Sequence, residues 1–230
     1  MTFSEIFSCF MQLIYPENCL ICGENLVQTE NQICLSCLIQ LPKTNYHLQL
    51  DNPVEKRFWG KIRVEHASSF CFFEKGAMIQ KLMHELKYRD NREIGEILGK
   101  HFGMDLAESS FYQDIDVILP VPLHKNRYHK RGYNQSEEIA KGIAVALKKP
   151  VDTQIITRAI ENPTQTKKGV FERWENTTGI FVVNDIATLS DKHILLVDDV
   201  LTTGSTLEAC GQAILTIPNI RLSVVTLAMA

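Results

Sequence analysis

From residue 64 onward the chain alternates between two patterns of polar and apolar positions. Short, mostly apolar runs predict buried strands at residues 64–74, 116–120, 194–197 and 221–229. Between them, apolar residues spaced by three and four positions predict helices at about 78–89, 92–106, 134–147 and 206–215. This alternation predicts an α/β fold with a mostly parallel sheet flanked by helices.

Two carboxylates, Asp198 and Asp199, and a loop of small polar residues at 202–206 follow the strand predicted at 194–197. Four consecutive apolar residues indicate a strand buried on both faces, and ligands of such sheets bind at the carboxyl edge. Free backbone N–H groups, hydroxyls and a helix N-terminus at the loop favour a phosphate. The paired acids could hold a ribose diol or help with Mg²⁺. The alternative is an ordinary strand-to-helix turn, in which Asp and Thr supply capping.

A basic loop, residues 120–137, follows the strand predicted at 116–120. It lies at the carboxyl end of a strand and just before a helix N-terminus, so we expect its cations at the same edge as the acid pair. Arginine makes bidentate contacts to phosphate, which suits a pyrophosphate or a similar anion. A solvated charged loop is the alternative. The basic side chains are His124, Lys125, Arg127, His129, Lys130 and Arg131. The candidate anion-binding residues are Arg127, Arg131, Gly132, Asn134 and Gln135.

Four of the seven cysteines form two Cys-x-x-Cys pairs, Cys19 with Cys22 and Cys34 with Cys37. In a chain with no recognisable export signal, two such pairs predict a closed, tetrahedral Zn²⁺ site of structural type. Redox-active or simply reduced cysteines are the alternative. We predict that residues 1–45 form a helix at about 3–15 followed by this zinc module, because a four-thiolate site lets a short segment fold with little core.

Two polar stretches remain. Residues 46–60 are irregular and are predicted to be a linker, which leaves 61–230 as the second domain.

A long polar and basic connection lies between short strands predicted at 154–157 and 179–183. Such a connection is unusual in a compact domain unless it is functional, so we predict a mobile lid. A surface excursion without a catalytic part is the alternative.

Composition narrows the class of protein only a little. The chain has 230 residues, of which 45% are hydrophobic and 22% charged, as in globular proteins. Its net charge of -3 gives no global argument for nucleic acid. No apolar run approaches the roughly 18 to 20 residues that span a bilayer. The N-terminus lacks the basic region of a signal peptide. We therefore expect a cytoplasmic protein without membrane insertion.

The stretch 194–206 resembles the phosphoribosyl-diphosphate (PRPP) signature of type I phosphoribosyltransferases. The resemblance implies that Asp198 and Asp199, the candidate catalytic residues, bind the 2′- and 3′-hydroxyls of the ribose. It also implies that Mg²⁺ accompanies PRPP and that a lid closes from the 158–178 part of the chain. The residues that it assigns to the 5′-phosphate are Thr202, Thr203, Gly204, Ser205 and Thr206.

Together with Pro120-x-Pro122, Arg127 and Arg131-Gly-Tyr-Asn-Gln135, this signature resembles the ComF family of competence-associated proteins. Members of that family join an N-terminal four-cysteine zinc module to a domain with the type I phosphoribosyltransferase fold. The resemblance covers nearly the whole chain. It implies a link to DNA uptake, with single-stranded DNA and a competence helicase as candidate partners. The positions that fit the same family pattern, and are the candidate lid residues, are Arg158, Gln165, Arg173 and Asn176.

Three functions stay open on the sequence. The first is Mg²⁺-dependent phosphoribosyl transfer from PRPP, for which the sequence indicates neither an acceptor nor a general base. The second is a non-catalytic uptake factor that binds single-stranded DNA through the basic loop, Lys167, Lys168 and the zinc module. Tyr128 and Tyr133 give only thin support for base stacking in that case. The third is a catalytically silent PRPP sensor. The sequence does not indicate an oligomeric state.

Overall fold

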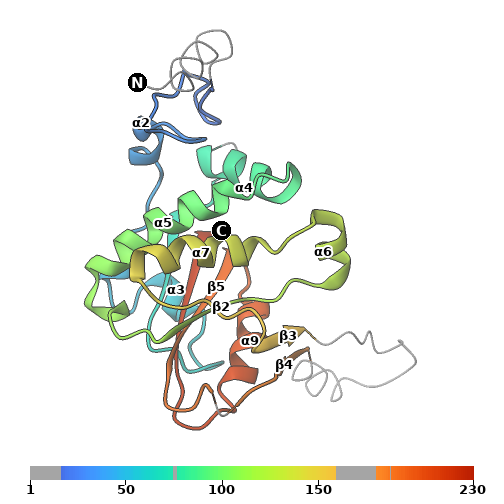
Figure 1. Ribbon diagram of the computed structural model, residues 1–230. Coiled ribbons are helices and arrows are strands. Elements are labelled where there is room, and N and C mark those ends of the chain that lie inside the picture. The colour runs from blue at the N-terminus through green and yellow to red at the C-terminus, as the bar shows by residue number, and fades with distance from the viewer. Residues whose placement is uncertain (1–16, 75–76, 159–179, 187) are drawn as a thin grey trace.

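A four-stranded parallel sheet forms the centre of the protein in the computed structural model, which describes residues 17–74, 77–158, 180–186 and 188–230 (Figure 1). The strand order is β1–β6–β5–β2, and each neighbouring pair runs parallel. Their carboxyl ends therefore meet at one edge. This sheet confirms the predicted α/β class. The strands are β1 (Ala67–Phe72), β2 (Val117–Pro120), β5 (His193–Leu201) and β6 (Arg221–Met229).

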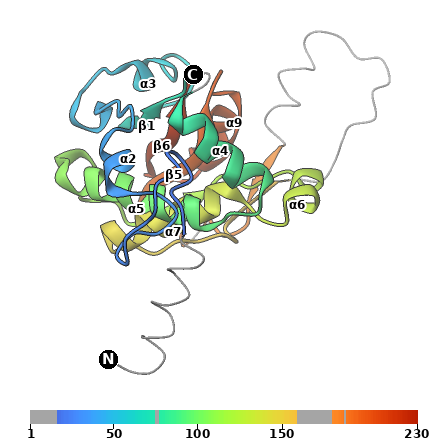
Figure 2. The ribbon, with the colours of Figure 1, turned by 90° about the horizontal axis from the view of Figure 1, so that it is seen from above.

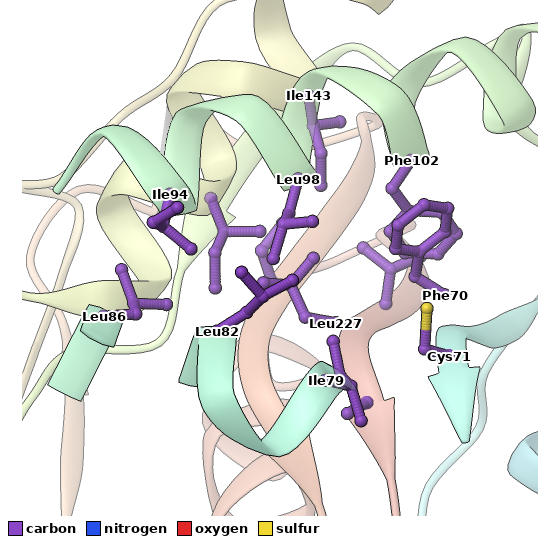
Figure 3. Close-up of a cluster of buried hydrophobic side chains, with 14 of the residues drawn as sticks. Phe70, Cys71, Ile79, Leu82, Leu86, Ile94, Leu98, Phe102, Ile143 and Leu227 are labelled. Atoms are coloured by element: carbon purple, nitrogen blue, oxygen red, sulfur yellow. The ribbon is translucent and has the colours of Figure 1, made fainter. Parts of the chain in front are cut away.

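Both faces of the sheet are covered, which explains the unbroken apolar runs in the sequence. Successive residues of β5 alternate between two cores: Leu195 and Val197 face one, whereas Ile194 and Leu196 face the other. Side chains of the covering helices meet those of β1 and β6 in the first core (Figure 3). The helices on this face are α4 (Met78–Tyr88), α5 (Glu93–Glu108) and α7 (Gln135–Leu147).

The helices α5 and α7 pack backbone against backbone through glycines. A Cβ placed on Gly99 would lie 2.2 Å from the carbonyl oxygen of Ile139, and one placed on Gly142 would lie 2.2 Å from that of Glu96. Gly95 and Gly103 stand one turn to either side of Gly99, so the three glycines share one face of α5. This close contact fixes α7, whose first turn reaches the carboxyl edge of the sheet.

The second face carries α9 (Ser205–Ile214) and α3 (Pro53–Lys56). Residues 46–60, predicted as a linker, are folded: they contain η1 (Tyr46–Leu48) and α3, and they bury Val54 and Phe58 in the second core. The side chain of Asn52 caps α3 and donates to the carbonyl oxygen of Ala67 on β1, at 2.9 Å. Polar residues thus serve structural roles here that a polar composition alone does not show.

A short helix, α6 (Lys125–Arg131), lies within the segment predicted as a basic loop, so that prediction was wrong for these residues. His124 caps the helix by accepting from the N–H group of Asn126, and Gly132 ends it with a left-handed φ of 78°. All seven residues of α6 are at least partly exposed. Its sequence therefore has no apolar periodicity that could have revealed a helix.

The rest of the described chain lies around this core. The cysteine segment, with α2 (Leu35–Ile39), lies on one side of the molecule and α6 on the other (Figures 1 and 2). Strands β3 (Ile156–Arg158) and β4 (Phe181–Val183) form an antiparallel pair, and η2 (Ser110–Tyr112) precedes β2. The helix predicted at 3–15 lies outside the described residues. No helix of the described part is both long and apolar enough to cross a membrane.

Candidate functional site

A pocket of about 550 Å³ opens at the carboxyl edge of the sheet. Its floor is the end of β5, with Asp198 and Asp199. One wall is the end of α4, and another combines α6 with the first turn of α7. Arg158 of β3 and the loop before α9 add to the lining, as do Phe73, Val121, Leu123 and Ala230. Parts of the chain that are far apart in sequence thus converge where parallel sheets commonly bind their ligands.

The acid pair lies within β5 rather than after it. The strand pairs with β6 as far as Leu201 opposite Met229, so both acids belong to the extended strand. One oxygen of Asp198 accepts from the hydroxyl of Ser136 and from the backbone N–H group of Asp199, each at 2.9 Å. The carboxylate of Asp199 pairs with the ammonium of Lys87 at 2.8 Å. The two carboxylates therefore have different partners and face different charges.

Asp198 differs from an ordinary surface carboxylate. Burial raises the pKa of Asp198, the neighbouring Asp199 charge raises it further, and the result is a pKa of about 7. Hydrogen bonds from Asp199 and Ser136 and the positive charge of Lys87 act in the opposite direction but do not offset burial. A carboxyl that is half-ionised near neutral pH is typical of a ligand site rather than of a structural ion pair.

We expect Asp198→Asn to gain stability relative to the parent protein as the pH rises from 4 to 8. A carboxyl whose pKa is raised on folding contributes most below its unfolded pKa of about 3.9, and this contribution is lost as the pH rises through about 7. At pH 8 the neutral amide avoids that cost, on the order of 1 kcal/mol or more. Urea unfolding at several pH values measures the difference. An equal gain at pH 4 and pH 8 would contradict a raised pKa for Asp198.

The loop at residues 202–206 leads into the helix α9. Gly204 is its N-cap residue and has a left-handed φ of 82°, which a side chain would strain. A small hollow of about 30 Å³ is lined by residues 202–207 together with Asp198 and Val200. The hydroxyls of Thr203 and Ser205 lie 3.1 Å apart beside it. All five residues assigned to the 5′-phosphate on sequence, 202–206, therefore line this hollow, which adjoins the larger pocket through Asp198, Val200, Thr202 and Thr206.

The basic wall contains some of the residues that the sequence suggested, but not all. Arg127, Arg131 and Gln135 line the pocket, and Arg131 donates to the amide oxygen of Gln135 at 2.7 Å. Gly132 ends α6, and Asn134 caps α7 while its amide donates to the carbonyl oxygen of Val121. These two residues shape the segment and are not among the residues that line the pocket.

Arg158 is the one candidate lid residue within the described part of the chain, and it lines the pocket from β3. Burial and the nearby positive charge of Arg127 lower its pKa below the ordinary arginine value. Two guanidinium groups that repel each other across a pocket favour an anion between them. The other candidate lid residues, Gln165, Arg173 and Asn176, lie outside the described residues.

The structure adds several residues to the pocket that the sequence did not suggest as site residues. Lys87, His84 and Tyr88 come from the end of α4, and Ser136 comes from the first turn of α7. Lys87 lies near the end of the helix predicted at about 78–89, and no motif marks it as a site residue. Its partner Asp199 lies far along the chain, and no local spacing signals such a pair. Ser136 directly follows Arg131-Gly-Tyr-Asn-Gln135. It could therefore have been predicted from the sequence more easily than Lys87.

The four cysteines of the two Cys-x-x-Cys pairs come together, with their sulfur atoms all within 4.8 Å of one another. The sulfurs of Cys22 and Cys34 are 3.8 Å apart, and a tetrahedral ion with Zn–S bonds of about 2.3 Å holds its sulfurs roughly 3.8 Å apart. Backbone N–H groups of Ile21 and Cys34 point at the sulfur of Cys19, at 3.4 and 3.3 Å. The donor set and its spacing therefore fit a structural zinc ion.

Cys19 has thiolate character, whereas the pKa of Cys34 is raised, and burial and the neighbouring thiols raise that of Cys37. Burial by itself would raise the pKa of Cys19, but backbone N–H groups of Cys22, Cys34 and Ile21 outweigh it and lower the pKa to about 6. Cys71 and Cys210 are buried elsewhere, as small hydrophobic residues, while Cys9 lies outside the described residues. The cluster is thus separate from the remaining described cysteines.

The comparisons with known proteins agree with this geometry. A family model described as the phosphoribosyl transferase domain matches residues 131–227. DNA utilization protein YhgH of Escherichia coli (strain K12) is 26% identical over 201 residues, which cover 86% of this chain and 83% of that protein. Competence protein F of Haemophilus influenzae is 24% identical over 209 residues (86% and 90%). Competence protein ComFC of Bacillus subtilis is 26% identical over 204 residues (83% and 80%).

Among solved structures, the adenine phosphoribosyltransferase of Saccharomyces cerevisiae is 17% identical, with a TM-score of 0.40 over 62% of this chain and 72% of that one. The parallel sheet and the domain match define a phosphoribosyltransferase-like protein. The four-cysteine cluster and the relatives named as competence proteins narrow this class of protein to one family. Together these findings support the ComF family of competence-associated proteins as the family of this chain.

Proposed function

We propose that this protein binds PRPP, or a related ribose phosphate, with Mg²⁺ and transfers its phosphoribosyl group. The observation that carries the proposal is one pocket in which a carboxylate pair, a small-residue loop and several arginines converge. The diol of the ribose lies on Asp198 and Asp199, and the 5′-phosphate lies on residues 202–206. The pyrophosphate lies toward Arg127 and Arg131. The acceptor is a nucleophile of unspecified class, and the protein acts in the cytoplasm.

The pocket's own residues account for the chemistry of such a transfer. Attack at C1′ develops charge on the ribosyl ring and on the departing pyrophosphate, and fixed cations stabilise the latter. The carboxylates accept hydroxyl hydrogen bonds and hold the ring in place. Because Lys87 already pairs with Asp199, Mg²⁺ fits best on the phosphate oxygens of the ligand, where it would neutralise charge.

We expect the purified protein to bind PRPP with Mg²⁺, and the double variant Asp198→Asn/Asp199→Asn to bind it at least about 100-fold more weakly. Each lost charge-assisted hydrogen bond to the diol costs roughly 1.5–3 kcal/mol. Isothermal titration calorimetry measures both affinities. Asn substitutions keep the shape of the side chains, and Asp191→Asn, on the exposed surface, controls for the loss of a negative charge. Equal affinities of the parent and the double variant would refute the assignment of the diol.

A screen of PRPP consumption against bases, amines and ammonia then separates an enzyme from a PRPP sensor. Turnover with any acceptor supports transfer, whereas tight binding without turnover supports the sensor. The acceptor list is broad because nothing in the described pocket singles out one chemical class.

The second candidate function is a nucleic-acid uptake factor, and the observation that favours it is α6. This helix lies on one side of the molecule (Figure 2), it and its cap residue carry six basic side chains, and two of these, Arg127 and Arg131, line the pocket. The relatives named for DNA utilization and competence point the same way. In this case single-stranded DNA lies along α6, and a competence helicase is the candidate partner. Tight binding of single strands that weakens steeply with salt would support this function, and a flat salt response would exclude it.

We also propose that Cys19, Cys22, Cys34 and Cys37 hold one structural Zn²⁺. The proposal also divides the chain into a module at 1–45 and a phosphoribosyltransferase-like domain at 61–230, to which the folded residues 46–60 are added because Val54 and Phe58 pack in its second core. Side-chain hydrogen bonds dock the cysteine segment on the domain: Lys81 with the carbonyl oxygen of Ile21, Gln32 with Glu93 and Asn91, and Asn31 with Glu93. The module would therefore support the helices that carry one wall of the pocket.

A further inference from the structure

Three consecutive residues at the end of α4 contact three different segments, and the contacts of Lys87 and Tyr88 are with residues that line the pocket. The carbonyl oxygen of Leu86 accepts from the hydroxyl of Tyr133. The ammonium of Lys87 lies 2.8 Å from Asp199, and the ring of Tyr88 lies 5.7 Å from the guanidinium of Arg131. The end of α4 therefore connects the acidic strand with the basic wall.

The charges that line the pocket are unbalanced in favour of cations. Lys87, Arg127, Arg131 and Arg158 line it together with two side-chain carboxylates, those of the acid pair. Within the pair that Lys87 forms, the side chain of Lys87 is 20% exposed and that of Asp199 is 18% exposed. A lysine with so little exposure needs an anionic partner both with and without a ligand, because an unpaired buried charge is costly.

The stereochemistry of PRPP places its pyrophosphate close to that ion pair. The pyrophosphate is attached to C1′ on the same face of the ring as the 2′- and 3′-hydroxyls. A cation in contact with the carboxylate that holds those hydroxyls is therefore within reach of the first phosphate. Lysine suits an exchange of partners, since its ammonium is a point charge with rotatable donors on a flexible stem. The backbone need not move, because the contact between Leu86 and Tyr133 anchors it.

We propose that Lys87 is a pyrophosphate-binding residue that exchanges Asp199 for a phosphate oxygen when the ligand binds. The proposal rests on the proposed function and adds a third element, α4, to the two motifs that the sequence shows. The exchange releases Asp199 to accept from a ribose hydroxyl. Binding of the diol and binding of the pyrophosphate are thereby coupled through one side chain. A ribose phosphate without a pyrophosphate leaves Lys87 on Asp199.

The test compares three probes on the full chain: PRPP with Mg²⁺, pyrophosphate with Mg²⁺, and ribose 5-phosphate. For Lys87→Met we expect affinity for the first two to fall at least about tenfold, as for a lost charge-assisted contact, and affinity for ribose 5-phosphate to change less than about threefold. Lys87→Arg should restore most of the affinity for both pyrophosphate-containing probes. Lys100→Met, an exposed lysine on α5, is the matched control and should bind all three as the parent does.

Two results would overturn the proposal. An equal loss for all three probes means that Lys87 only positions Asp199, and a loss below about threefold for PRPP means that it contacts neither ligand group. If the parent protein does not bind PRPP, the proposed function fails. The role of Lys87 is then decided by the affinities of the parent and of Lys87→Met for pyrophosphate. A tenfold loss of pyrophosphate affinity would support that role, whereas unchanged or absent pyrophosphate binding would refute it. Thermal unfolding of each variant identifies any that is misfolded.

Discussion

Replacing Gly99 by alanine is expected to destabilise the protein by about 3 kcal/mol or more, although alanine is the better helix former by about 1 kcal/mol. The added methyl group would lie 2.2 Å from the carbonyl oxygen of Ile139, which is backbone and cannot rotate away. The helices α5 and α7 must therefore separate, and the buried side chains between them lose contact. Urea unfolding followed by circular dichroism measures the loss.

A matched control is available on the same helix. Met104 is half exposed on α5, so Met104→Ala changes helix propensity without touching α7 and should alter stability by less than about 0.5 kcal/mol. Gly142→Ala should act as Gly99→Ala does, because its methyl group meets the backbone of Glu96 from the opposite side. The two substitutions share one interface, so their combined cost should be less than additive. A Gly99→Ala variant as stable as the parent would contradict the close backbone contact.

This contact illustrates what the sequence could and could not predict about the fold. Apolar spacing predicted α5 and α7, since both helices bury a stripe against the sheet. The spacing of Gly95, Gly99 and Gly103 by four positions places them on one helical face, but spacing alone does not identify the partner. Residues 46–60 were misread for a different reason. Their polar groups cap α3 and bond to β1, and a capping Asn52 cannot be distinguished from a loop residue in a single sequence.

In the candidate site, too, some residues could be predicted from the sequence and others could not. The stretch 194–206 could be predicted because one strand, its acids and its loop are contiguous, and strand order then places them at the carboxyl edge. Arg127 and Arg131 were found because they follow another parallel strand. Lys87 was missed because its role depends on where α4 crosses the sheet, which follows from packing of Ile79 and Leu82 and not from any motif. The helix α6 was missed because it buries no stripe.

The second large effect is expected at the cysteine cluster: removal of zinc should unfold residues 17–41 while the sheet remains folded. The described part of this segment buries few apolar side chains, among them Ile33 and Leu41, which cannot stabilise it alone. A structural zinc contributes about 10–16 kcal/mol of apparent binding free energy at pH 7, and this is folding free energy for such a module. The sheet has two cores of its own and does not need the ion.

Metal analysis should find one zinc per chain in the parent protein and almost none in Cys34→Ser, because three thiolates cannot close the tetrahedral site. Cys210→Ala removes a buried cysteine of α9 instead and should retain the metal. Hydrogen exchange should show protection of residues 17–41 lost in Cys34→Ser and after chelation, with β5 and β6 still protected. Residues 17–41 that remain protected in a protein without metal would refute a zinc-dependent module, and the cysteines would then be simply reduced thiols. The contact of Lys81 with the carbonyl oxygen of Ile21 joins this segment to α4, the helix that carries Lys87.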